Sequence, residues 1–533
     1  MKRFKKLISV VLAVATVVSL TACGSGSPSS GGSAGGSAGG SATAGSESKD
    51  TLIMGYTKEP DTVAPGADAK TNAQMVVGIL YDGLVGKDPA DQSVIVPSIA
   101  DTWDFSEDGT VLKLHVRDDI KFHDGTALTM DDVLYSLKYA CEQPLNVAGA
   151  NLIKEYKDAG DNNLEITLQY AYKPFLQILA TPGFSIICKA THEKAVADGA
   201  NFGITENGTG AYKLVSWSTG DKMVLESNDS WHRGTPEIKH VEIKLLSDET
   251  SGALMVENGE IDFFIGMNNA DRARLEANEK LRMVNAPSAG TYCLLMNQNP
   301  GSVFADNKAL REAVAYAINR EEILLGGMNG VGEVTPGIIT PGYFGYIENS
   351  EYYEYNPELA KQKLAEAGYP DGIDLTYKVP SDSWYANPSQ VIVEELRQVG
   401  IRCNLQIMER STFLKEVHEQ MNYDMAYYIS WGDFPDADQQ AWPKYHSTSI
   451  GAQMGNHIGL NNPAVDELLM KARTSMDDDE RKALYEELNH LNYENVWYLW
   501  ILTTYNAVVI NKDLQNVVEI PSGYYNPAFY SWA

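Results

Sequence analysis

The sequence has little cysteine and little positive charge. It holds 5 cysteines among 533 residues, and 42 lysines and arginines against 71 aspartates and glutamates, for a formal net charge of −29. The four cysteines after Cys23 lie too far apart for a Cys-x-x-Cys or a zinc spacing, so buried free thiols are their expected state. The acidity argues against nucleic acid or an anionic lipid surface as the partner.

Catalytic motifs are also missing. From residue 50 onwards there is no Gly-x-Ser-x-Gly, no His-Glu-x-x-His and no phosphate-binding Gly-rich loop followed by Lys-Ser or Lys-Thr. Acidic pairs are abundant, but nothing in the sequence places two of them at the separation that glycoside hydrolysis requires. We therefore expect a protein that is not an enzyme and that uses neither a cofactor nor a metal.

The first 22 residues have the pattern of a secretory signal peptide. Four basic residues within positions 1–6 precede Leu7–Leu20, which is largely apolar and shorter than the roughly 20 residues of a membrane-spanning helix. The stretch leads into Leu20-Thr21-Ala22-Cys23, which resembles the lipobox of bacterial lipoproteins. We expect cleavage before Cys23 and acylation of its thiol, which would hold the protein on the extracytoplasmic face of the cell membrane.

Residues 23–49 follow as an expected tether. Gly24–Ser48 consists almost entirely of Gly, Ser and Ala, and such a segment buries too little apolar surface to offset the entropy of ordering. A flexible chain of about 25 residues spans on the order of 25–30 Å. The remaining chain, about 485 residues, is longer than one hydrophobic core usually allows, so two or more lobes are expected.

A strand and helix pattern in the C-terminal half predicts a parallel α/β unit. Strands are expected at 373–379, 401–408 and 423–431, with helices at 390–399 and 412–421 between them. Ligands of open α/β sheets bind beyond the carboxyl ends of the strands.

Two loops occupy that position, after the first and the third of these strands. They are Pro380–Asn387 and Gly432–Gln440, and both are aromatic and polar, as a small-molecule cleft requires. In the N-terminal half, Thr57 and Glu59 follow the first expected strand, 52–55, at the corresponding place.

Dispersed motifs resemble those of one protein family. Residues 97–103 (Pro-Ser-Ile-Ala-Asp-Thr-Trp), 121–125 (Lys-Phe-His-Asp-Gly), 208–214 (Gly-Thr-Gly-Ala-Tyr-Lys-Leu) and 431–436 (Trp-Gly-Asp-Phe-Pro-Asp) follow the order typical of the family 5 extracellular solute-binding proteins. These are the dipeptide-, oligopeptide- and nickel-binding components of ABC importers. The resemblance covers residues 50–533.

The resemblance implies an α/β, two-lobed periplasmic-binding-protein-like fold, the large family 5 variant of type II, with a ligand cleft between the lobes. Lobe I would span residues 50–287 and lobe II residues 288–505. Residues 506–533 would return to lobe I.

The resemblance also assigns roles within the cleft. In peptide-binding members an Asp near a Trp-x-x-Asp segment pairs with the ligand's α-amino group; Asp433 takes this place here, with Asp436 as the alternative. Such a charge-assisted bond is roughly twice as strong as a neutral one. Dipeptide binders hold the ligand carboxylate with an Arg in the loop matching Ser381–Tyr385, and this loop contains none. That departure favours longer peptides bound through their backbone, or an amine-bearing solute without a carboxylate.

The sequence therefore predicts a monomeric substrate-binding lipoprotein that captures peptides and delivers them to an ABC permease and its ATPase. The alternatives are a nickel complex, an oligosaccharide or another amine-bearing solute on the same scaffold, a peptide sensor, and, with less support, an exported hydrolase. The expected ligand contacts are Asp433, Trp431, Gly432, Trp384, Tyr385, Ser383, Glu59 and Thr57.

Overall fold

The computed structural model describes residues 49–533 except for short gaps at 69, 144–146, 201–202, 204–206, 269, 433 and 453–454. The expected signal peptide, Cys23 and nearly all of the tether lie outside the described residues. Among the described residues, no helix combines the length and apolar character needed to cross a membrane.

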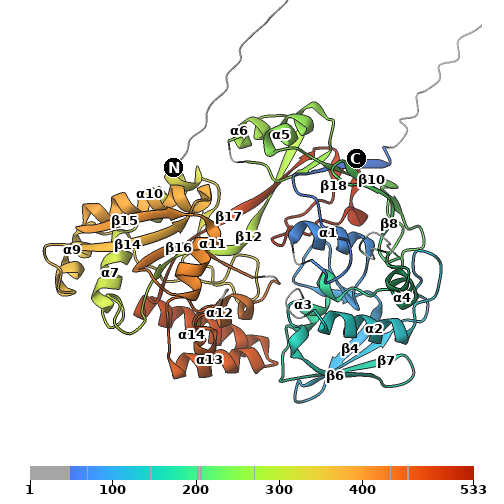
Figure 1. The fold of residues 1–533 in the computed structure, drawn as a ribbon, viewed down its shortest axis with the longest axis horizontal. Helices are drawn as coiled ribbons and strands as arrows, with labels where there is room; N and C mark the ends of the chain where they lie inside the picture. Colours follow the sequence, from blue (N-terminus) through green and yellow to red (C-terminus); the bar gives the residue numbers. More distant parts are fainter. Residues whose placement is uncertain are drawn as a thin grey trace, which may run out of the picture. The chain divides into compact units, whose positions relative to one another are not determined.

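One large mixed sheet extends through the described chain (Figure 1). Its strands in spatial order are β15 (Ile401–Met408), β14 (Ile373–Pro380), β16 (Met425–Trp431), β12 (Leu281–Met296), β17 (Tyr498–Asn511), β11 (Phe263–Ile265), β1 (Thr51–Tyr56), β10 (His240–Leu245), β9 (Lys222–Ser227) and β8 (Tyr212–Ser218), with β13 (Glu333–Val334) paired to β17. A second sheet has the order β4 (Ala100–Phe105), β5 (Val111–Val116), β7 (Asn163–Leu168) and β6 (Ile153–Asp158). Two small sheets pair β2 (Val85–Lys87) with β3 (Ile95–Pro97) and β18 (Leu514–Gln515) with β19 (Ser531–Trp532).

Helices of both halves pack around these sheets. Those of the first half are α1 (Thr71–Leu80), α2 (Met130–Cys141), α3 (Phe175–Leu179), α4 (Lys189–Ala197), α5 (Glu249–Asn258) and α6 (Arg272–Glu276). Those of the second half are α7 (Lys308–Ala317), α8 (Arg320–Glu322), α9 (Pro357–Glu366), α10 (Ser383–Gln398), α11 (Arg410–Phe413), α12 (Ala437–Tyr445), α13 (Pro463–Thr474) and α14 (Asp478–Asn495).

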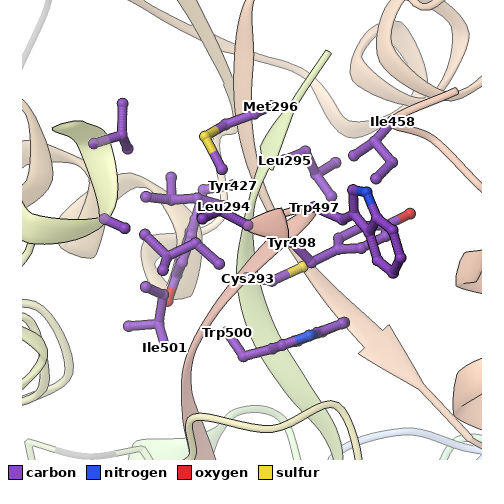
Figure 2. Packing of buried hydrophobic residues seen from close by; sticks show 14 of the residues in the cluster. Cys293, Leu294, Leu295, Met296, Tyr427, Ile458, Trp497, Tyr498, Trp500 and Ile501 are labelled. Carbon is purple, nitrogen blue, oxygen red and sulfur yellow. The ribbon is translucent and has the colours of Figure 1, made fainter. Parts of the chain in front are cut away.

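The buried apolar residues gather in separate cores that define two lobes. The largest core takes all its residues from the chain between Ala289 and Leu502. Figure 2 shows its centre, where Cys293 of β12 lies level with Trp500 of β17 in the register of the two strands. Other cores belong to the N-terminal half, and the C-terminal residues from Val508 onwards join them. The predicted two-lobed α/β class is confirmed, while the predicted boundary residues stay a prediction.

The chain passes between the lobes along β12 and β17, which pair antiparallel (Figure 1). Val284 and Val508 face each other within the lobe I core, and Leu294 and Leu499 face each other within the lobe II core. The register shifts between Pro287 and Thr291, midway along β12. This irregular stretch is where the pair of strands can bend without breaking either core.

The strands of the parallel unit of lobe II lie where the pattern predicts, but both helices differ. The helix expected at 412–421 is α11 followed by a π-helical turn at Leu414–Glu419. α10 begins at Ser383 rather than Gln390, and Pro388 lies inside it. Proline usually marks a helix start, so the pattern placed the start after it. Here the N–H that Pro388 lacks would have been donated to the carbonyl of Trp384, an exposed residue whose carbonyl can be hydrated instead.

Candidate functional site

The carboxyl ends of three parallel strands meet at one edge of the lobe II sheet. β14 lies between β15 and β16 and is parallel to both. The chain leaves β14 for β15 on one side and then crosses to β16 on the other side. Such divergence of connections marks the place where open α/β sheets bind ligands. The loops after β14 and β16 chosen from the sequence both lie at this edge.

The loop after β14 places one aromatic side chain in solvent and buries the next. Trp384 is 45% exposed, whereas Tyr385 is 3% exposed. The ring of Tyr385 stacks on that of Tyr428 in β16, with centroids 5.2 Å apart and planes at 11°. Burial and the neighbouring phenols raise the pKa of Tyr385 far above its ordinary value, so it stays neutral. Tyr385 fixes the loop to the sheet, and Ser383 and Trp384 before it are exposed to solvent.

The segment after β16 is held by its backbone. The N–H of Gly432 donates to the carbonyl of Ala289 at 3.0 Å, and its own carbonyl accepts from the Tyr343 hydroxyl at 3.0 Å. A Cβ on Gly432 would lie 3.2 Å from Cγ of Gln440, so a side chain there would crowd α12. Trp431 is half-buried beside it. Asp433, the expected amine anchor, lies outside the described residues.

Asp436 has a structural role that competes with ligand binding. Its carboxylate is buried and pairs with Arg481 at 2.7 Å, and it also accepts the N–H of Asp438 at the start of α12. Burial raises the pKa of Asp436, and the Arg481 guanidinium opposes this shift. Both bonds fall on Oδ1, and the whole side chain is buried beside the Arg481 guanidinium, so Asp436 does not support the alternative that it binds the ligand amine.

The two lobe I residues chosen from the sequence contact other parts of lobe I. Both oxygens of Glu59 accept from the Gly220 N–H at 3.1 Å, and one accepts from the Trp217 indole N–H at 2.7 Å. Glu59 thus ties the loop after β1 to the β8–β9 hairpin. Thr57 packs beside Gly266, which follows β11. The structure therefore groups the lobe II residues around one sheet edge, while Thr57 and Glu59 form a separate group.

A basic residue that the sequence patterns did not single out lies at the lobe II edge. Arg410 starts α11, directly after β15, and its Nη2 donates to the Tyr428 hydroxyl at 3.1 Å. The signal for it was present, because residues 401–408 were a predicted strand in the same parallel unit. The loops after the other two strands are aromatic and so indicate a cleft more strongly than this polar segment does.

Side chains of both lobes meet beside the segment that follows β16. Tyr172 of lobe I donates to Asp438 at 2.8 Å, and Asp438 also pairs with Arg473 at 2.8 Å. Lys173 of lobe I pairs with Asp478 at 2.7 Å. Phe434 of lobe II is buried among apolar residues of the lobe I core.

A cavity of about 760 Å³ adjoins these contacts. Lobe I lines it with Pro174 and Leu176, and lobe II with Tyr343, Phe344 and Pro435. Its volume is within the range of small-molecule pockets.

The four cysteines that follow Cys23 are free thiols. Cys188 and Cys293 are buried, as expected, whereas Cys141 and Cys403 are only partly buried. Within the described ranges, no three His, Cys, Asp or Glu side chains come together as a metal site would require.

This architecture is that of a two-lobed solute-binding protein. It matches the solved structure of HbpA2 from Haemophilus parasuis with a TM-score of 0.83 and 22% identity, covering 91% of this chain and 100% of that one. It also matches the periplasmic binding protein DppA of Helicobacter pylori in complex with the peptide STSA, with a TM-score of 0.73, 21% identity and coverage of 90% and 98%.

The sequence comparison gives the family. The model of the bacterial extracellular solute-binding proteins, family 5, matches residues 94–452, and this chain belongs to that family. It is similar to the glutathione-binding protein GsiB of Escherichia coli K12, with 27% identity over 458 residues, covering 84% of this chain and 88% of that protein.

Proposed function

We propose that this chain is the lipid-anchored substrate-binding protein of an ABC importer and that it captures peptides between its two lobes. The observation that carries the proposal is the lobe II sheet edge, where the exposed Trp384, the half-buried Trp431 and the cation of Arg410 surround the ends of parallel strands. Family membership supports solute binding rather than catalysis. Peptide as the solute class is supported by relatives, since DppA was solved with a peptide and GsiB is named for glutathione, itself a tripeptide.

Capture follows from the way the lobes are joined. The two strands β12 and β17 form the passage between the lobes, and their irregular stretch at Pro287–Thr291 would serve as the hinge. Closure over a peptide excludes water, which strengthens each polar contact inside the cleft. A peptide that bridges both lobes binds the closed state better than the open one and therefore shifts the population toward it. The closed form would be the one presented to the permease.

Recovery of bound solutes tests the proposal directly. The full-length exported protein, purified in detergent, is incubated with a mixture of synthetic peptides, sugars and nickel–histidine complexes, washed and denatured, and the released solutes are identified by mass spectrometry. We expect intact peptides to be retained. Retention of only sugars or metal complexes would contradict the peptide assignment, and recovery of cleaved peptides would indicate a hydrolase.

Asp433→Asn is expected to weaken binding of a retained peptide by about 2–5 kcal/mol, because a buried ammonium would lose its charged partner. Calorimetric titration of the wild type and the variant measures this loss. The same peptide with an acetylated amino group should bind both proteins weakly and about equally. Asp374→Asn is the control, since this carboxylate is exposed and pairs with Arg402 at the opposite end of β14. Equal affinities of wild type and Asp433→Asn for the free peptide would mean that another group binds the amine.

Cys23→Ser is expected to release the protein from the membrane fraction without changing its affinity for peptide, because the thiol is the proposed site of acylation. Metabolic labelling with a radioactive fatty acid detects the acylation, fractionation measures the release, and calorimetric titration with a retained peptide checks that the affinity is unchanged. Cys141→Ser is the matched control and should stay labelled and membrane-bound. If wild type carries no label, the protein is exported without a lipid anchor.

A further inference from the structure

Arg410 differs from the other arginines of the described chain in its partners. Seven of them form ion pairs with carboxylates: Arg117, Arg272, Arg274, Arg397, Arg402, Arg473 and Arg481. Four others donate to backbone carbonyls: Arg233, Arg282, Arg311 and Arg320. Arg410 donates to a phenol, the hydroxyl of Tyr428, and no carboxylate of the described residues forms an ion pair with it. Arg410 is therefore an exposed guanidinium whose hydrogen-bond acceptor is neither a carboxylate nor a backbone carbonyl, and the charge of Asp382 acts on it from beyond ion-pair distance.

The guanidinium of Arg410 lies at the ligand edge of the sheet. Arg410 follows Met408, which is level with Pro380 in the parallel register of β15 and β14. The register of Lys378 with Ala426, continued by two residues, puts Tyr428 level with Pro380 as well. Arg410, which follows β15, therefore contacts Tyr428 of β16, the strand on the other side of β14. The contact lies at the end of β14 where the chain connections to β15 and β16 diverge.

The partner that holds Arg410 is itself immobilised. Tyr428 is 4% exposed, and its ring stacks on the rings of both Tyr385 and Phe413. The ring centroids of Tyr428 and Phe413 are 5.3 Å apart. Its hydroxyl thus presents a fixed acceptor, and the guanidinium also lies 6.0 Å from the centre of its ring. Arg410 itself is exposed, so the rest of its five-donor fork faces solvent. Orientation before binding lowers the entropy cost of engaging a ligand.

We propose that Arg410 binds the carboxylate of the captured peptide, so that the ligands are peptides with a free C-terminal carboxylate or an acidic side chain. The inference rests on the proposed function and narrows its substrate class. The planar fork of an arginine matches the two oxygens of a carboxylate, and β15 would thus supply the cation that the loop after β14 lacks. It replaces the expectation of a ligand without a recognised carboxylate.

Paired peptide pools test this assignment. One pool holds random di- to tetrapeptides with a free C-terminal carboxylate, and the second holds the same peptides as C-terminal amides, both restricted to side chains without acids. Full-length protein in detergent is incubated with equal amounts of both pools, and quantitative mass spectrometry gives the ratio of retained acid to retained amide. We expect wild type to favour the acids by about 10- to 100-fold, the usual range for a hydrogen-bonded charged partner.

Arg410→Gln is expected to bring that ratio close to one, chiefly by lowering the retention of the acids. Arg410→Lys, which keeps the charge but loses the fork, should give an intermediate ratio. Arg402→Gln removes an exposed cation from the other end of the same strand and should leave the ratio at the wild-type value. Circular dichroism and melting curves check that each variant is folded.

The outcomes separate the two proposals. A wild type that retains no peptide from either pool overturns the proposed function and this inference with it. A wild type that binds peptides with a ratio that Arg410→Gln leaves unchanged overturns the role of Arg410 alone.

Discussion

Arg481→Met is expected to lower the free energy of unfolding by about 3–5 kcal/mol, because it leaves a buried carboxylate without its cation. Arg481 is 2% exposed and Asp436 is 3% exposed, and their side chains are 2.7 Å apart. The guanidinium also donates to the carbonyl of Ala472 at 3.2 Å and lies 4.4 Å from the centre of the Phe344 ring. Methionine fills much of the same volume without these interactions. Urea denaturation, followed by tryptophan fluorescence, measures the loss.

A double variant separates the two possible causes of this loss of stability, the unpaired charge of Asp436 and the lost packing of Arg481. Asp436→Asn combined with Arg481→Met removes the buried negative charge that the single variant leaves without a partner. The asparagine side chain can still accept a backbone N–H at the start of α12. We expect the double variant to regain a large part of the lost stability. Lys482→Met, at the exposed neighbouring position, should change stability by less than about 0.5 kcal/mol. A double variant no more stable than Arg481→Met would show that packing, not the charge of Asp436, accounts for the loss.

Glu395→Gln is expected to become more stabilising, relative to wild type, as the pH rises from about 5 to 8. Glu395 of α10 is 3% exposed, and burial raises the pKa of its carboxyl from 4.5 to about 8. One oxygen accepts the Asn319 N–H at 3.1 Å. Between these two pKa values the folded state holds a proton that the unfolded state has lost. The contribution of this carboxyl to the free energy of unfolding of the wild type is therefore greatest below pH 4.5. It falls as the pH rises toward 8, by at most about 1.4 kcal/mol per pH unit.

Unfolding by urea at pH 5, 6, 7 and 8 measures this difference, since glutamine cannot ionise and its own contribution stays constant. Glu394→Gln is the matched control, because Glu394 is the next residue in the same helix and its exposed carboxylate pairs with Arg397. The control should show no growing difference from wild type over this range. A stability difference between Glu395→Gln and wild type that is the same at every pH would mean that Glu395 is ionised in the folded protein.

Local signals in the sequence predicted local structure well. β15 occupies residues 401–408 as expected, and the strands expected at 373–379 and 423–431 are β14 and β16. Turn and capping residues act just as locally: Asp108-Gly109 lies in the turn between β4 and β5, and Thr129 forms a full capping box with Asp132 at the start of α2. In each case the residues that decide the structure lie within a few positions of one another. The periodicity and the turn chemistry are therefore complete within a short stretch of sequence.

Pairing between distant segments could not be predicted in the same way. Val284 faces Val508, and the register shift after Pro287 depends on how two strands more than 200 residues apart align. No pattern within β12 specifies its partner strand. The expectation of separate lobes came from the chain length, and their bounds came from the family resemblance; neither came from the residues of these strands.

The candidate site was predicted in its location but not in the state of each side chain. The loops after β14 and β16 do lie at one sheet edge. Tyr385 is buried because Tyr428, from another strand, covers it, and the Glu59 carboxylate is engaged because Trp217 reaches it. Neither partner is visible from the sequence around the residue concerned. Arg410 was missed for the same reason, since its distinction is the absence of a paired carboxylate among its described neighbours.

The place of β1 in the sheet has a mechanical consequence for a protein held by its N-terminal end. β1 lies between β10 and β11 and is parallel to both, with six residues in register with β10 from Thr51 to Tyr56. A pull on the chain ahead of Thr51 therefore acts along the strand, and the hydrogen bonds on both sides share the load and must yield together. A load on lobe I reaches this strand directly, whereas a load on lobe II reaches it only through β12 and β17. For a chain held at this end, those two strands would carry the whole load of lobe II, while β1 would carry the load of both lobes.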